Sequence, residues 1–112
     1  MAKRPYAFTL IAYVDEVAAG LVNCFEQFST FACKPLINIH DVVVLKQHRG
    51  RGISKRMLEQ VEQIALEKDC CKLTLEVLTG NAVARSAYQG FGFSSYQLSP
   101  ETGSAEFWQK LL

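Results

Sequence analysis

Two glycines separated by one residue, Gly50 and Gly52, stand where an apolar stretch of the sequence gives way to an amphipathic one. Glycine has no Cβ, so the backbone can come close to a bound ligand. The first amides of a helix lack partners within the helix and carry the positive end of its dipole, so such a junction can receive a phosphate or diphosphate. Arg49, Arg51 and Lys55 add positive charge there. The alternative is an ordinary glycine-rich turn with solvated arginines.

Two common phosphate-binding loops do not fit this spacing. The Walker loop requires Gly-x-x-x-x-Gly-Lys-Ser/Thr, which the chain does not contain. The dinucleotide loop requires a third glycine or alanine where this chain has Lys55. The sequence therefore indicates neither nucleotide hydrolysis nor nicotinamide chemistry.

A strand and a helix must position the glycine turn. Residues 36–45 are apolar enough for a strand buried on both faces, at the centre of a sheet. Apolar residues then recur at three- and four-residue spacing and predict an amphipathic helix with these core positions: Ile53, Met57, Val61, Ile64 and Ala65. The alternating residues 72–78 predict a following strand, so a right-handed crossover should join two parallel strands.

The N-terminal part predicts an antiparallel hairpin. Residues 6–14 and 20–28 are rich in aromatic and β-branched side chains, which favour strands. The tip is expected near residues 15–19.

The C-terminal part predicts a helix and two strands. The helix is expected over residues 82–89, ended by Gly90 in the left-handed conformation. Residues 93–98 and 105–111 predict strands around a turn. The expected fold class is α/β, an α+β mixed sheet with two helices, in a single domain over residues 1–112.

The composition is that of a folded protein without a strong overall charge. Of 112 residues, 49% are hydrophobic and 21% charged, and the net charge is +1. No overall field therefore attracts nucleic acid or anionic lipid. The longest apolar runs are far shorter than the roughly 20 residues of a membrane-spanning helix, and the N-terminus has no apolar signal core. We expect a cytoplasmic protein that binds neither nucleic acid nor membrane.

The cysteines do not indicate a metal site. Cys24, Cys33, Cys70 and Cys71 lack the paired spacing of zinc ligands. A disulfide between the adjacent Cys70 and Cys71 would be strained. Buried or half-buried free thiols in a reducing compartment are expected, with no metal bound.

A second motif downstream gives the glycine turn a specific interpretation. The sequence Gln-x-x-Gly-x-Gly at residues 47–52 resembles the Gln/Arg-x-x-Gly-x-Gly/Ala diphosphate loop of the GNAT acetyltransferase superfamily. Residues 81–93, Asn-x-x-Ala-x-x-x-Tyr-x-x-x-Gly-Phe, resemble that family's second motif. The order and spacing of the two motifs make the match far more specific than either alone. It covers roughly residues 36–112, and the opening hairpin fits the family's second and third strands.

The resemblance implies a GNAT-like acyltransferase fold, in which acetyl-CoA lies in the opening of a splayed central strand pair. The strand edge at Val42 and Val44 would hydrogen-bond the pantetheine arm. Asn81 would also bind this arm, and Tyr88 would lie near the thioester sulfur. The diphosphate would rest on the turn and the first helical residues, which are Gln47, His48, Arg49, Gly50, Arg51, Gly52, Ile53 and Ser54.

The implied reaction is direct attack of an amine acceptor on the acetyl carbonyl, which yields an N-acetylated product and free CoA. Tyr88 is the candidate proton donor to the departing thiolate. Ordinary packing of Tyr88 on Phe91 or Phe93 is the alternative. A strand N–H, that of Val44, would polarise the carbonyl.

A base or a water chain must take the proton of the attacking amine, because an ammonium has no lone pair. His40 is the candidate base, on the face that it shares with Asn38, since alternate strand residues point the same way. A surface or structurally bonded histidine is equally compatible with the sequence. Glu26 and Glu76 are weaker candidates.

The sequence departs from the family pattern at its N-terminus. Family members usually begin with a strand and one or two helices that wall off the acceptor pocket, and about five residues precede the first predicted strand here. Three explanations fit this short form. A second protomer supplies the wall of the pocket, or the acceptor is large and lies in an open groove, or the domain binds acetyl-CoA without efficient turnover. We expect a homodimer, because truncation would expose aromatic residues among Tyr6, Phe8, Phe25 and Phe28.

Two functions remain open from the sequence. The first is an acetyl-CoA-dependent N-acetyltransferase, and the alternative is a non-catalytic CoA-binding or interaction module that keeps the cleft. Nucleic-acid binding through the basic residues near the turn is a weaker third, because the overall charge is balanced.

Overall fold

The computed structural model describes most of the chain, namely residues 6–29, 32–78, 80–94, 97–99, 103–104 and 108–112. It divides into two units, residues 1–76 and 77–112, which are described one at a time. Among the described residues, no helix has the length and apolar character that crossing a membrane would require.

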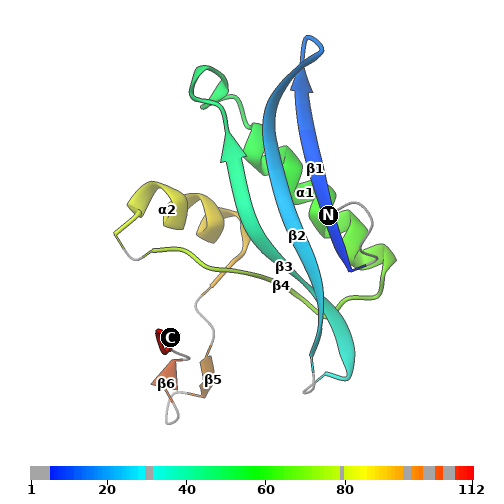
Figure 1. Cartoon of the computed structure of the whole chain (residues 1–112), viewed down its shortest axis with the longest axis vertical. Helices are drawn as coiled ribbons and strands as arrows, with labels where there is room; N and C mark the ends of the chain where they lie inside the picture. Colours follow the sequence, from blue (N-terminus) through cyan, green and yellow to red (C-terminus); the bar gives the residue numbers. More distant parts are fainter. Residues whose placement is uncertain (1–5, 30–31, 79, 95–96, 100–102, 105–107) are drawn as a thin grey trace. The chain divides into compact units, whose positions relative to one another are not determined.

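The first unit is built on a four-stranded mixed sheet (Figure 1). The strands β1 and β2 pair antiparallel, as do β2 and β3, whereas β3 and β4 are parallel. In spatial order the strands are β1 (Ala7–Val14), β2 (Val17–Ser29), β3 (Lys34–Val44) and β4 (Leu73–Leu75). The predicted mixed sheet and its parallel pair are therefore confirmed.

The β1–β2 turn is tighter than the sequence predicted. Asp15 and Glu16 both have positive φ, 49° and 68°, and Val14 pairs directly with Val17. Two such residues form a type I′ turn, whose twist matches that of the strands it joins. The second strand consequently begins at Val17 rather than Gly20.

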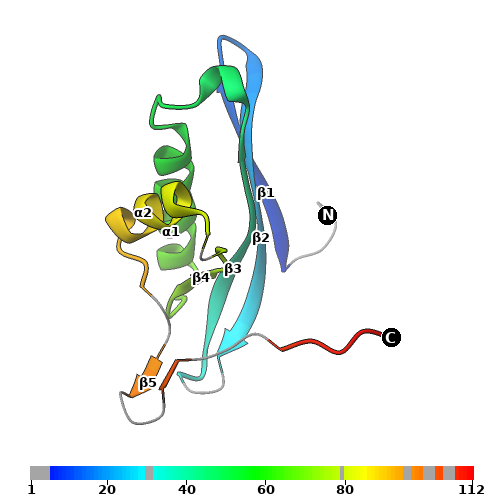
Figure 2. The same cartoon turned by 90° about the vertical axis from the view of Figure 1, so that its left-hand side faces the viewer.

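The helix α1 (Ile53–Glu67) covers one face of the sheet (Figure 2). Its predicted apolar stripe is buried, with Leu58 added and Ile64 only half-buried. Fully buried Val22, Cys24 and Ile37 lie beneath it on the strands. The opposite face, called the outer face below, carries no described element of this unit. It exposes Ile11, Tyr13 and Val43.

The two halves of β3 have different surroundings. Residues 37–39 pair with β4, and Leu36, Ile37 and Ile39 are buried. Beyond Ile39 the pairing with β4 ends, and residues 40–44 are exposed or half-buried. The prediction of a strand buried on both faces was therefore wrong for its second half. The parallel pair is joined over three residue pairs only, as expected for a splayed pair.

The second unit contains α2 (Ala82–Phe91), which is longer than predicted. The helix continues through Gly90 and ends at Gly92, whose φ is 112°. There the Phe93 N–H donates to the Tyr88 carbonyl and the Gly92 N–H to the Gln89 carbonyl. This Schellman pattern places the left-handed residue at Gly92, so the predicted end at Gly90 was wrong.

The two closing strands are short. They are β5 (Gln97–Ser99) and β6 (Gly103–Ser104), paired antiparallel. The first overlaps the strand predicted at 93–98. The second, β6, precedes the strand predicted at 105–111. Of that predicted range, residues 105–107 lie outside the described residues, and residues 108–111 form no strand. That strand was misplaced.

The two glycines of α2 make the position of its end testable. Gly90→Ala should raise the free energy of unfolding by about 0.5–1 kcal/mol, because alanine loses less backbone entropy in a helix and its Cβ would meet nothing within 4 Å. Gly92→Ala should lower it by roughly 1–2 kcal/mol, because alanine is strained in the left-handed conformation. Chemical denaturation measures both values. If the two variants changed stability in the same direction, the helix end would be misplaced.

The cysteines differ in exposure. Cys24, Cys70 and Cys71 are free thiols. Cys24 is buried, and this burial raises its pKa to about 12. Cys70 is half-buried, but Cys33 and Cys71 are exposed, so the expectation of shielded thiols was wrong for these two.

Candidate functional site

The free edge of β3 begins where its pairing with β4 stops. The N–H of Leu45 donates to the Ala19 carbonyl on β2 at 2.8 Å. Successive strand residues point their N–H and C=O groups to opposite sides, so those of Val42 and Val44 point away from β2. In the described part of the first unit, no strand pairs with this edge. Two predicted cofactor-binding amides therefore face an open edge.

The turn after β3 needs glycine. A 3-10 turn over Lys46–His48, which the sequence analysis missed, comes first. Gly50 and Gly52 follow with φ of 78° and 76°, and a Cβ added at either would meet nothing within 4 Å. The glycines are thus required by backbone conformation, and the space beside them is open.

The start of α1 has no side-chain cap. Gly52 occupies the N-cap position, and the first turn contains no acidic residue. The amides of Ile53 and Ser54 are among those that an α-helix leaves without an internal acceptor, at the positive end of the dipole. This arrangement favours an anion with several oxygen atoms.

The side chains of His48 and Arg49 have specific surroundings in the turn. Those of Gln47 and Arg51 are exposed. Arg49 Nε donates to the Val44 carbonyl at 3.0 Å, so this guanidinium is bound to the end of the strand. His48 Nδ1 is buried and has no hydrogen-bond partner in the described part of the chain. Buried polar atoms are rarely left unpaired, so a water or a ligand should complete this site. The turn therefore fits a diphosphate.

A bulge in β3 turns two neighbouring polar residues to the outer face. The β2–β3 register shifts beside Asn23, and His40 is the extra residue. The His40 ring contacts Phe25 edge-on with centroids 5.6 Å apart, and Asp41 Oδ2 accepts from Asn23 Nδ2 at 3.1 Å. Asn23 and Phe25 are two residues apart on β2 and share a face. His40 and Asp41 therefore share it too.

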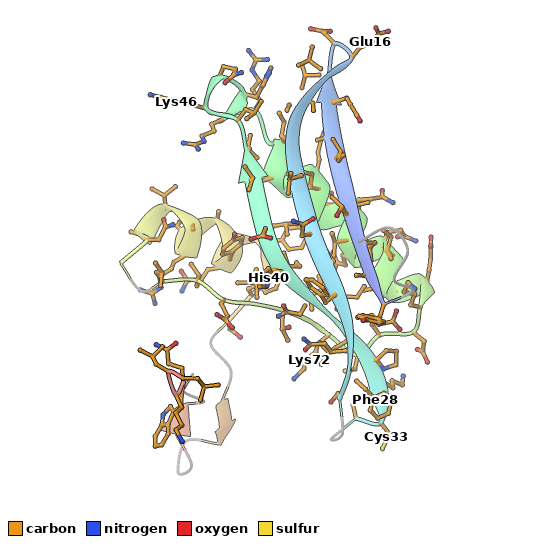
Figure 3. All side chains as sticks on the ribbon, in the orientation of Figure 1. Glu16, Phe28, Cys33, His40, Lys46 and Lys72 are labelled. Atoms are coloured by element: carbon orange, nitrogen blue, oxygen red, sulfur yellow. The ribbon has the colours of Figure 1, made fainter. Side chains whose placement is uncertain are left out.

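A small pocket opens beside His40. It has a volume of about 70 Å³ and is lined by Asn38, Ile39, His40 and Glu76. Asn38 Nδ2 donates to Thr74 Oγ1 at 2.9 Å, which links β3 to β4 at this point. Figure 3 shows His40 partway along β3. The pocket thus brings together His40, Asn38 and Glu76, three of the residues considered from the sequence.

Glu26 is not part of this pocket. Its carboxylate accepts from Lys68 Nζ at 3.3 Å, just beyond the end of α1. Its register partner on β3 is the buried Ile37, on the face that α1 covers. Glu26 is therefore a surface ion-pair residue, and its candidacy as the base was wrong.

The residues of the second motif lie in the second unit. Asn81 Oδ1 accepts from the Ala84 N–H at 3.1 Å and so caps α2. The half-buried Tyr88 ring contacts Phe93 edge-on, with centroids 5.9 Å apart. Burial disfavours the phenolate and raises the pKa of Tyr88 above its ordinary 10.0. Tyr88 therefore packs on Phe93 and keeps the proton that a donor needs.

Asp41 is a polar residue of the outer face that sequence analysis did not single out. Regular alternation would have placed it on the face opposite His40. The bulge reverses this alternation. The available signal was the pair His40-Asp41 itself, which interrupts an otherwise apolar half of the strand.

One family model and several known proteins are similar to this chain. The model of the Acetyltransferase (GNAT) family matches residues 1–93. An uncharacterized N-acetyltransferase of Archaeoglobus fulgidus is 35% identical over 80 residues, which cover 70% of this chain and 54% of that protein. A thialysine N-epsilon-acetyltransferase of Bos taurus is 36% identical over 56 residues, which cover 50% of this chain and 33% of that protein. The chain thus spans between a third and just over half of the length of these two relatives.

A solved structure has a similar fold. It is an aminoglycoside N-acetyltransferase in complex with CoA, with a TM-score of 0.78 at 22% sequence identity. The match covers 98% of this chain and 80% of that one.

Proposed function

Because the chain belongs to the acetyltransferase (GNAT) family, we propose that it transfers the acetyl group of acetyl-CoA to the nitrogen of a small amine or a peptide amine. The turn after β3 is the observation that carries this proposal. It combines two glycines at positive φ, an uncapped helix start and the unpaired Nδ1 of His48. A diphosphate would accept hydrogen bonds from the free amides of the helix start and would fit the open space beside the glycines.

The chain's residues would hold the cofactor mainly through main-chain groups. The amide of Val42 would bind the pantetheine arm along the free edge, the N–H of Val44 would bind the carbonyl oxygen of the acetyl group, and residues 47–54 would bind the diphosphate. Asn81 contributes its side-chain N–H groups to the arm, since its Oδ1 already caps α2. Acetyl-CoA supplies the activated acetyl group as a thioester.

Two side chains would move protons in the reaction. His40 takes the proton of the attacking amine, either directly or through one water in its pocket. The Tyr88 hydroxyl donates its proton to the departing thiolate. The Val44 N–H stabilises the negative charge that develops on the carbonyl oxygen.

A substitution of the base tests this assignment. His40→Gln should lower kcat by about 100-fold or more, because general base catalysis typically contributes 100- to 10,000-fold, and it should leave the affinity for acetyl-CoA unchanged. Glu26→Gln is the matched control on the other face and should retain wild-type kcat. Thiol release under saturating acetyl-CoA measures both variants. A large loss in Glu26→Gln with none in His40→Gln would reverse the assignment.

Release of CoA thiol in the presence of a panel of amines tests the function itself. Turnover by the wild type that falls by about 100-fold or more in Tyr88→Phe and in His40→Ala supports the acetyltransferase. Calorimetric binding of acetyl-CoA without turnover in the wild type and in both variants would instead identify a CoA-binding module.

We also propose that residues 1–112 act as one domain and that the protein is a cytoplasmic homodimer. Tyr6 and Phe28 are 46% and 63% exposed, which supports association, whereas Phe8 and Phe25 are half-buried and contribute less than expected. The free thiols of Cys24, Cys70 and Cys71 suit a reducing compartment. Light scattering coupled to size-exclusion chromatography should give twice the mass of the chain, and a monomer at all concentrations would contradict the dimer.

A further inference from the structure

Three polar side chains form a hydrogen-bonded row across the outer face. Thr9 Oγ1 donates to Asn23 Oδ1 at 2.6 Å, and Asn23 Nδ2 donates to Asp41 Oδ2 at 3.1 Å. The three residues are register partners on β1, β2 and β3. The row therefore fixes the orientation of the Asp41 carboxylate from two neighbouring strands.

The row leaves the charge of Asp41 available. Because the Thr9 hydroxyl occupies the Asn23 carbonyl oxygen, the amide nitrogen of Asn23 must face Asp41. A carboxylate has about four acceptor positions, and this bond uses one of them. Asp41 is exposed and makes no ion pair with the described residues. A carboxylate that is oriented but not neutralised is suited to bind a cation.

The position of Asp41 relates this cation site to the reaction. Asp41 follows His40 directly in the chain, and the bulge turns both side chains to the outer face. Consecutive Cα atoms are about 3.8 Å apart. An acceptor whose reacting nitrogen lies at His40 can therefore reach Asp41 with a second group a short chain away.

Asp41 is unsuited to hold the reacting nitrogen itself. A carboxylate in contact with an amine stabilises its ammonium form. The ammonium form has no lone pair with which to attack the acetyl carbonyl. The group that binds Asp41 should therefore be a cation that does not react.

We propose that Asp41 selects acceptors that carry a second cationic group beside the amine to be acetylated, and that Asn23 is the residue that positions it. This inference rests on the proposed function, because it takes His40 as the place of the reacting amine. It adds a substrate class to that function. The class comprises short diamines and larger acceptors in which the reacting amine and the second cationic group are equally far apart.

Equilibrium binding to the full chain in the presence of CoA tests the proposal. The probes are the four-carbon diamine putrescine and butylamine, which has the same chain and a single amine. Wild type should bind putrescine about fivefold more tightly than butylamine, the upper range for one exposed ion pair. Asp41→Asn keeps the shape of the side chain and should abolish this preference.

Variants of Asn23 separate positioning from charge. Asn23→Ala keeps the Asp41 charge but removes its hydrogen bond, so the putrescine preference should fall about twofold while butylamine binding is unchanged. Glu16→Gln removes one carboxylate at the β1–β2 turn (Figure 3) and should retain the full preference. Circular dichroism of each variant checks that the fold is kept.

The outcomes distinguish this proposal from the proposed function. Equal affinity of wild type for the two amines, no binding of either, or an undiminished preference in Asp41→Asn would overturn the selection by Asp41. If instead the preference depends on Asp41 but no amine is acetylated, the selection stands and the acetyltransferase function falls. Normal acetylation without a diamine preference would support the acetyltransferase function and overturn the selection by Asp41.

Discussion

Gly52→Val should lower the affinity for acetyl-CoA by about 100-fold or more, which corresponds to one or two lost hydrogen bonds to a charged group. Gly52 begins α1 at a φ of 76°, and a Cβ there would meet nothing within 4 Å of the protein. The valine side chain would consequently occupy the open space that the diphosphate needs. It would also strain the backbone, at a cost of roughly 1–2 kcal/mol in stability. Calorimetry with acetyl-CoA and chemical denaturation measure the two effects.

Gly90→Val is the matched control for this substitution. It adds the same side chain at a glycine that also has nothing within 4 Å, but within α2 and without positive φ. The affinity for acetyl-CoA should stay within about twofold of wild type, since a surface change away from a site typically alters free energies by at most about 0.5 kcal/mol. Unchanged binding by Gly52→Val would remove the glycine turn from the cofactor site.

Tyr88→Phe should lower kcat by about 100-fold or more, the usual range for loss of a proton donor. The phenylalanine ring keeps the edge-on contact with Phe93, so the stability of α2 and the affinity for acetyl-CoA should change little. Steady-state kinetics with acetyl-CoA and an accepted amine measure the effect. Tyr13→Phe, at an exposed position near the end of β1, is the control and should retain wild-type kcat.

The pH dependence of kcat gives a second test of Tyr88. Burial raises its pKa above the ordinary 10.0, so the protonated donor persists to higher pH than in a free tyrosine and is lost only as pH rises through the raised value. The contribution of Tyr88 should therefore stay constant from neutral pH to about pH 9. A Tyr88-dependent decrease in kcat below pH 9 would contradict the role of the hydroxyl as donor.

Local patterns were sufficient for several features of the fold. The spacing of Ile53, Met57 and Val61 predicted α1 and its buried stripe, because helix periodicity depends only on the order of residues. The position of Gly50 and Gly52 between a strand and a helix predicted a turn at which the backbone can come close to a ligand, and the structure adds that both have positive φ.

Other features depended on contacts between distant residues. The register shift beside Asn23 arises from the pairing of β2 with β3, and it decides that Asp41 joins His40 on the outer face. Likewise, the ion pair between Glu26 and Lys68 joins residues 42 apart in the chain, and it places Glu26 away from the pocket.

The sequence by itself determined the order and type of the main elements and the glycine turn with its free amides, because periodicity and backbone preference act over a few neighbouring residues. Only the tertiary structure decided which face each polar side chain of β3 occupies and where β3 loses its partner. A single extra residue in one strand reverses the side-chain alternation that follows it, and strand register is set by pairing across the sheet rather than by local preference.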